Sequence, residues 1–226
     1  NTKLSKTHLI HKEKIFTIVM EMEDTYMQYA LIGDLHSDFK NTKAVLKHIQ
    51  EIAPHAKIIG LGDLYECIIG KRKAATLTKH VSLEEAVVMK KKFTKLLTFP
   101  SIIGNQEERI AAVTGRKEFL HYEEKIIIEN ATLMHGHQFD IDENFHVTFP
   151  PYETPLLFFG HSHRAAIYIN GVRTKVEYNK PIYVGNQKYE INVGAVVESR
   201  DWCLYDSEEM TVTFLQAVRK THFAPK

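Results

Sequence analysis

Five short polar blocks each follow a short apolar run, and this repeated pairing limits the fold more than any other feature of the chain. Apolar runs of this length predict buried strands, and in open α/β sheets ligands collect at the carboxyl ends of strands. A Gly before the first polar residue lets the backbone turn sharply there. We therefore expect an α/β protein in which one sheet edge gathers the blocks GDLHSD (33–38), GDLYE (62–66), GNQE (104–107), MHGH (134–137) and GHSH (160–163).

The side chains in these blocks are carboxylates, one amide and imidazoles, with no thiolate among them. Such ligands suit Mn, Fe, Zn or Ni. They are too many for one ion that must also bind water and substrate, and they suit two ions that share a carboxylate. Two-metal sites of that kind are typical of phosphate-ester hydrolysis. The candidate metal ligands are Asp34, His36, Asp63, Asn105, His135, His161 and His163.

In this order the blocks resemble the signature of the calcineurin-like metallophosphoesterase superfamily, which is D-x-H, GD-x-x-D, GNH(D/E), a further His and GH-x-H. The resemblance runs from about Met27 to about Val218. It implies an α/β fold, a four-layer α/β/β/α sandwich of two mixed β-sheets flanked by helices. It also implies that Asp34, His36 and His163 bind a first metal, that Asn105, His135 and His161 bind a second, and that Asp63 bridges the two.

Two positions depart from the signature. Glu66 stands where Asp is usual and keeps the carboxylate, whereas Gln106 stands where the family most often has the His that assists the leaving group. An amide cannot ionise, so we expect diesters or esters with acidic leaving groups to be favoured, and Gln106→His to raise activity on monoesters. The candidate catalytic residues are Asp63, Gln106 and His137, and the candidate substrate-binding residues are Asn105 and Arg164.

Two of these candidates have an alternative interpretation. His137 points into the cleft if the chain has turned after His135, or to the surface if the strand continues. Arg164 could contact a phosphate or lie exposed.

The chain is more similar to the small prokaryotic phosphodiesterase-like members of the superfamily than to its protein phosphatases, because Asp63 is not followed by their Arg-Gly block. We expect a binuclear metal-dependent phosphoesterase, more specifically a phosphodiesterase, that uses a metal-bridging hydroxide and two divalent metal ions. Mn is favoured, with Fe, Zn or Ni as alternatives. One competing hypothesis is a non-catalytic, metal-containing scaffold that binds a protein partner. Another is a nucleotide or protein phosphomonoesterase.

Composition sets modest limits. The chain has 226 residues, 44% hydrophobic and 25% charged, as in an ordinary soluble protein of one domain. A net charge of +1 gives no argument for nucleic acid, and no apolar run approaches the roughly 18 residues that span a bilayer. Cys67 and Cys203 lie far apart, which favours free thiols in a reducing compartment. We therefore expect a cytoplasmic enzyme with a small phosphate-ester substrate, whose oligomeric state stays open.

Residues 1–26 combine a basic start with a short apolar stretch at Ile15–Met20. The stretch is too short for a signal peptide, and no small-residue cleavage site follows it. All five blocks come after Met27. We therefore expect residues 1–26 to form an extension outside the catalytic fold and residues 27–226 to form the metallophosphoesterase domain.

The rest of the chain alternates helix and strand patterns. Asn41–Ile52 carries apolar residues at helical spacing and stops before Pro54. Ser82 and Glu85 form a capping box that opens a helix expected to reach Leu96. Segment 67–81 could be a basic rim over the site or a loop. Further expected elements are a helix at Glu107–Ala112 and strands at Ser101–Ile103, Glu190–Val197, Trp202–Tyr205 and Met210–Val218.

Overall fold

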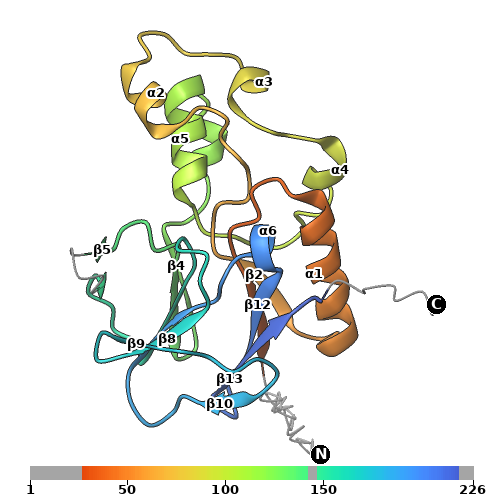
Figure 1. The fold of residues 1–226 in the computed structure, drawn as a ribbon, viewed down its shortest axis with the longest axis vertical. Helices are drawn as coiled ribbons and strands as arrows, with labels where there is room; N and C mark the ends of the chain where they lie inside the picture. The colour runs from red at the N-terminus through yellow and green to blue at the C-terminus, as the bar shows by residue number, and fades with distance from the viewer. Residues whose placement is uncertain (1–26, 142–146, 219–226) are drawn as a thin grey trace, which may run out of the picture.

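The computed structural model describes residues 27–141 and 147–218, so the expectation for residues 1–26 lies outside the described residues. In this part of the chain two β-sheets pack face to face (Figure 1). None of its helices has the length and apolar character that crossing a bilayer requires.

The first sheet has the order β10-β13-β12-β1-β2. Its centre is β1, which pairs in parallel with β2 and antiparallel with β12. Leu31 of β1 therefore has Ile59 and Cys203 as its neighbours across the two strand pairs. The strands are β1 (Gln28–Ile32), β2 (Lys57–Gly60), β10 (Pro181–Tyr183), β12 (Asp201–Asp206) and β13 (Thr211–Gln216).

The second sheet has the order β3-β4-β7-β11-β8-β9. The three strands β4, β7 and β11 run parallel to one another, and the outer pairs are antiparallel. A separate two-stranded ribbon joins β5 (Asp140–Ile141) to β6 (Val147–Thr148). The strands of the second sheet are β3 (Lys125–Ile128), β4 (Ala131–Met134), β7 (Leu156–Phe159), β8 (Ala166–Ile169), β9 (Val172–Thr174) and β11 (Tyr189–Asn192).

A core of apolar side chains fills the space between the two sheets. Leu31 and Tyr205 reach it from the first sheet, and Leu133, Phe158 and Ile191 reach it from the second. All five are fully buried, and the rings of Phe158 and Tyr205 lie with centroids 5.2 Å apart. Burying a Leu, Ile or Phe side chain stabilises a fold by about 1.5–3 kcal/mol, so this layer fixes how the two sheets face each other.

The outer faces of the sheets are covered differently. Helix α1 (Phe39–Ile52) and the short α6 (Val196–Ser199) lie on the first sheet, where the Nε1–H of Trp202 donates to Nδ1 of His48 at 3.0 Å. On the second sheet, Phe159 packs against the rings of Phe139 and Phe149 beside the β5–β6 ribbon. The predicted α/β class with two mixed sheets is confirmed.

Helices α2 to α5 gather at one end of the sandwich (Figure 1). The helix predicted at Glu107–Ala112 is confirmed and is longer, because it begins at Asn105 and ends where Gly115 adopts φ +71°. Segment 67–81 contains α2, whose first residues Lys71, Arg72 and Lys73 are exposed. The helices here are α2 (Lys71–Thr76), α3 (Leu83–Ala86), α4 (Lys91–Thr94), α5 (Asn105–Thr114) and the 3₁₀ turn η1 (Lys117–Leu120).

The single helix predicted from Ser82 to Leu96 is wrong. The capping box forms, but the helix ends at Ala86 and Val87 is extended, with φ −141° and ψ 141°. Val87 pairs with Cys67 in an isolated β-bridge, and Val88 N donates to the carbonyl of Glu66. This long-range pairing overrides the local helical pattern. In place of one helix, the segment contains two short helices, α3 and α4.

Two predicted strands depart most from their expected bounds. Glu190–Val197 holds the strand only as far as Asn192, because Gly194 turns the chain at φ +80° and α6 follows. Ser101–Ile103 makes isolated parallel bridges to Gly60 and Glu123 in place of a continuous strand. Both segments still deliver their polar residues to the same end of the sandwich.

Candidate metal centre

Five of the seven candidate metal ligands have a backbone in the left-handed region, with φ between 45° and 66°. Residues other than Gly adopt this region rarely and at a cost, and such positions concentrate at functional sites. Each turn lets a side chain leave the end of its strand and point across the sheet edge. These five residues are Asp34, His36, Asp63, His161 and His163.

Backbone hydrogen bonds hold the first two turns together. The amides of Leu35 and His36 donate to the carbonyl of Asp63 at 2.9 and 3.0 Å, and the amide of Asp34 donates to Gly62 at 3.2 Å. The first ligand loop therefore lies directly on the second. The strained backbone of one supports that of the other.

Two glycines let the chain approach the carboxylates closely. A Cβ on Gly160 would lie 2.5 Å from Oδ2 of Asp34, and a Cβ on Gly104 would collide with Oδ1 of Asp63. A side chain at either position would displace a candidate ligand. This contact explains why Gly precedes the polar residue in these two blocks.

The first group of ligands is Asp34, His36 and His163. Oδ1 of Asp34 lies 3.3 Å from Nε2 of His163 and 3.9 Å from Nε2 of His36. Its other oxygen, Oδ2, accepts a hydrogen bond from the amide of His161 at 2.9 Å. Asp34 is fully buried, so its orientation is fixed with one oxygen turned towards the two imidazoles.

The second group is Asp63, His135 and His161, with Asn105 beside it. Nε2 of His135 lies 3.3 Å from Oδ2 of Asp63 and 3.2 Å from Oδ1 of Asn105. The rings of His135 and His161 have centroids 5.1 Å apart. Asn105 is the first residue of α5, so the start of this helix sets the position of its amide oxygen.

Asp63 lies between the two groups. Its Oδ2 is 3.6 Å from Nε2 of His36 in the first group and 3.3 Å from Nε2 of His135 in the second. Its Oδ1 accepts a hydrogen bond from the amide of Gln106 at 2.8 Å. This is the position that a carboxylate shared by two ions would occupy.

The donor atoms of each group fit a divalent cation. In each triad the candidate ligand atoms all lie within 4.8 Å of one another. Among the described residues, Oδ1 of Asp34 and Nε2 of His36 are buried and make no hydrogen bond. Buried polar atoms without a partner are rare and costly, and a cation between these atoms would satisfy both.

Oxygen atoms outside the two groups orient the imidazoles. Nδ1 of His36 lies 2.5 Å from Glu66, that of His163 lies 3.2 Å from Glu198, and that of His135 lies 2.7 Å from the carbonyl of Leu61. When Nδ1 carries the proton in such a bond, the lone pair of Nε2 points to the metal, an arrangement common to metal-binding histidines.

Glu107 holds the backbone under the centre. Its side chain is fully buried and accepts hydrogen bonds at 3.0 Å from the amides of Asp63, Tyr65 and Gly104. Burial, and then the charge of Asp63, raise the pKa of Glu107 to about 7. One carboxylate therefore ties the block that carries Asp63 to the block that carries Asn105.

The protonation of the metal-free centre follows from its geometry. Burial alone would lower the pKa of His135, but the hydrogen bond and charge of Asp63 raise it to about 9. The close approach of Oδ1 of Asp34, 3.3 Å from Nε2 of His163, raises the pKa of His163 to about 9. Burial, and then the charge of His135, lower the pKa of His161 to about 4. Metal binding must therefore displace protons from His135 and His163.

The remaining candidates lie in different surroundings. Gln106 is buried, and its Oε1 accepts a hydrogen bond from the amide of Cys67 at 3.1 Å. His137 lies beside the centre, with its ring 5.3 Å from that of His135, and its Nε2 is 3.2 Å from Glu108. Arg164 is exposed, and within the described ranges it makes no ion pair with Asp34 or Asp63.

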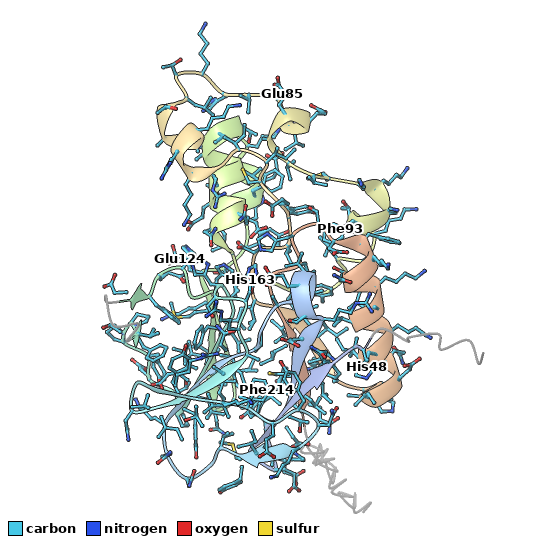
Figure 2. The ribbon with its side chains drawn as sticks, viewed as in Figure 1. His48, Glu85, Phe93, Glu124, His163 and Phe214 are labelled. Atoms are coloured by element: carbon cyan, nitrogen blue, oxygen red, sulfur yellow. The ribbon has the colours of Figure 1, made fainter. Side chains whose placement is uncertain are left out.

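Three residues of the centre have no role in the sequence prediction. Glu108 and Glu198 follow no metal-binding pattern, and only the fold brings them to His137 and His163. Asn192 is fully buried and donates to the carbonyl of Gly160 at 2.6 Å, which holds the last block in place. This contact joins residues 32 positions apart, and no local pattern in the sequence indicates it. Figure 2 shows His163 where the helical end meets the sheets.

Comparisons with known proteins bear on the family and the fold of the chain. The calcineurin-like phosphoesterase superfamily domain matches residues 27–204. A metallophosphoesterase from Sphaerobacter thermophilus has a similar structure, with a TM-score of 0.61, 17% identity, and coverage of 86% of this chain and 89% of that one. Yfce, a phosphoesterase from E. coli, gives a TM-score of 0.46 and 16% identity, covering 80% of this chain and 89% of that one.

A comparison of the sequence with curated proteins gives no match. The family match covers every candidate ligand, and the solved structure from Sphaerobacter thermophilus shares the fold. The chain belongs to the calcineurin-like phosphoesterase superfamily and is a metal-dependent phosphoesterase.

Proposed function

We propose that this protein is a binuclear phosphodiesterase that uses two divalent cations, with Mn²⁺ favoured. The observation that carries the proposal is the position of Asp63, whose Oδ2 lies within 3.6 Å of an imidazole nitrogen from each ligand group. Oxygen and imidazole donors without thiolate suit Mn²⁺, while Fe, Zn or Ni remain alternatives.

The residues of the chain would divide the work. Asp34, His36 and His163 would hold one cation, and His135, His161 and Asn105 would hold the other, with Asp63 shared. When bound, the cations would supply Lewis acidity that activates water and neutralises the phosphate oxygens. Glu66 and Glu198 would keep the two imidazoles beside them oriented.

The preference for diesters rests on the surroundings of Gln106. Monoesters with basic leaving groups gain about 10²–10⁴-fold from a positioned acid. The side chain of Gln106 cannot ionise, and its oxygen is engaged by the amide of Cys67. A diester also carries less negative charge than a monoester, so it depends less on a side-chain cation, and Arg164, which follows His163 in the chain, is exposed.

A phosphomonoesterase is the second candidate, and His137 favours it. The imidazole lies next to His135 and His161, with ring centroids 5.3 and 6.2 Å from theirs, and it contacts Glu108. An imidazole there could donate the proton that Gln106 cannot.

The ratio of kcat/KM for bis(p-nitrophenyl) phosphate to that for p-nitrophenyl phosphate decides between the two. The phosphodiesterase proposal predicts that this ratio, measured on protein loaded with Mn²⁺, lies above one. A ratio below one, with turnover of both substrates above background, would favour the monoesterase. Turnover of neither ester under any metal would favour the scaffold hypothesis.

A further inference from the structure

A cavity of about 980 Å³ opens at the edge of the second sheet, next to the metal centre. Its wall includes Ile103 and Met134, and these residues lead directly into the blocks that carry Asn105 and His135. Glu108, which contacts His137, forms another part of the wall. The cavity therefore borders the centre through Glu108 and through the segments that lead into Asn105 and His135.

The charged residues of the cavity are mostly acidic. They are four glutamates, Glu108, Glu123, Glu124 and Glu153, against one lysine, Lys125. Within the described ranges no ion pair joins Glu123 or Glu124 to a cation. The carbonyl of Glu123 accepts a hydrogen bond from the amide of Ile103 at 2.9 Å, which fixes this wall to the segment before Asn105.

Aromatic and apolar side chains complete the lining. Tyr122 and Tyr152 are half-buried and lie among Leu120, Ile127, Met134 and Pro151. The hydroxyl of Tyr152 donates to Glu190 at 2.7 Å, and Nζ of Lys188 lies 5.0 Å from its ring centroid. The ring of Tyr152 therefore already has Lys188 as a cation partner.

Carboxylates, tyrosine faces and apolar surface together suit an organic cation. An ammonium group gains from both the carboxylates and the ring faces, and its carbon atoms gain from the apolar wall. An anionic arm, such as a second phosphate, would be repelled by the glutamates. A neutral arm would gain nothing from them.

We propose that this cavity binds a cationic, partly apolar ester arm, so that the substrates are phosphodiesters of an amino alcohol. The proposal rests on the phosphodiesterase function proposed above. Figure 2 shows Glu124 and His163 in the region where the helical end meets the sheets.

A matched pair of substrates tests the proposal. The two are p-nitrophenyl phosphorylcholine and p-nitrophenyl 3,3-dimethylbutyl phosphate, which have the same shape and differ in the positive charge. For protein loaded with Mn²⁺ we expect kcat/KM to be about 3- to 10-fold higher for the cationic ester. The Glu123→Gln, Glu124→Gln double variant should bring this ratio close to one. Glu118→Gln, an exposed change outside the cavity, is the control and should leave the ratio unchanged.

The outcomes separate this inference from the proposed function. If both esters are hydrolysed with a ratio of one or less, or the double variant keeps the ratio, the cavity proposal is overturned while the phosphodiesterase stands. If neither ester is hydrolysed, the proposed phosphodiesterase function is wrong. Calorimetric titration with benzyltrimethylammonium then tests separately whether the cavity binds an organic cation. Saturable binding that the double variant weakens would support a cation site. No binding to the unaltered protein would overturn it.

Discussion

Oε2 of Glu66 lies 2.5 Å from Nδ1 of His36, and the opposite nitrogen of the same ring, Nε2, faces Asp34 and Asp63. The carboxylate therefore fixes the ring in the orientation that a metal ligand needs. Glu66 stands where the superfamily signature has Asp, and the longer side chain still makes this contact.

Replacing Glu66 should weaken metal binding without unfolding the protein. Its side chain is 40% exposed, so Glu66→Ala removes few packing contacts. We expect the Kd for Mn²⁺ to rise by roughly 10–100-fold, as for other residues that orient metal-binding imidazoles. Calorimetric titration measures it, with Glu51→Gln on α1 as the control. An unchanged Kd would show that Glu66 does not orient His36.

The stability of the metal-free protein should fall at alkaline pH. The pKa values of His135 and His163 are raised from 6.5 to about 9. The folded chain therefore keeps protons that the unfolded chain releases above pH 6.5, and this stabilisation is lost as pH rises through about 9. We expect the thermal midpoint of chelator-treated protein to fall by at least about 2 °C between pH 6.5 and 9.5. Protein loaded with metal should show a smaller fall, because its imidazoles are already neutral. Equal falls in both forms would contradict the protonation scheme.

Variants of Gln106 and His137 test which residue gives a proton to the leaving group. Since the side chain of Gln106 is bonded to the amide of Cys67, Gln106→Ala should lower stability by about 1–3 kcal/mol and leave the diester-to-monoester ratio nearly unchanged. His137→Gln should lower turnover of an alkyl phosphate monoester, which has a basic leaving group, by about 10-fold or more, with less effect on the aryl diester. Gln106→His tests the sequence prediction directly, since a rise in monoester turnover would support it. Equal losses on both substrates in His137→Gln would exclude His137 as the donor.

A chain of residues 27–226 should retain the activity of residues 1–226. The strand β1 begins at Gln28, and every candidate ligand lies after it. We expect thermal midpoints within a few degrees of each other and equal kcat/KM on the aryl diester. An insoluble or inactive shorter chain would show that residues 1–26 belong to the catalytic fold.

The gathering of the seven candidate side chains could be predicted because it depends on local pattern. Strand β7 (Leu156–Phe159) has the bounds that its apolar run indicates, and Gly160 and His161 follow it directly. A strand and a Gly leave little choice about where the next side chain points. The order of such blocks is therefore visible without a structure.

The parts that could not be predicted depend on contacts between distant segments. The chain at Val87 is extended because it pairs with Cys67, which no local spacing indicates. Glu198 contacts His163 only because α6 follows the turn at Gly194. Gln106 looked like a residue that faces the substrate, and its partner is the backbone of Cys67.

The metal content of the protein and of its Asp63→Ala variant tests the central claim most directly. After loading with Mn²⁺ and removal of free metal, elemental analysis should find about two ions per chain. Asp63→Ala should lose most of both ions and lower turnover of the aryl diester by at least about 10³-fold, because Asp63 is the carboxylate placed between the two ligand groups. One ion or none in the unaltered protein, or two ions with intact turnover in the variant, would contradict the binuclear account.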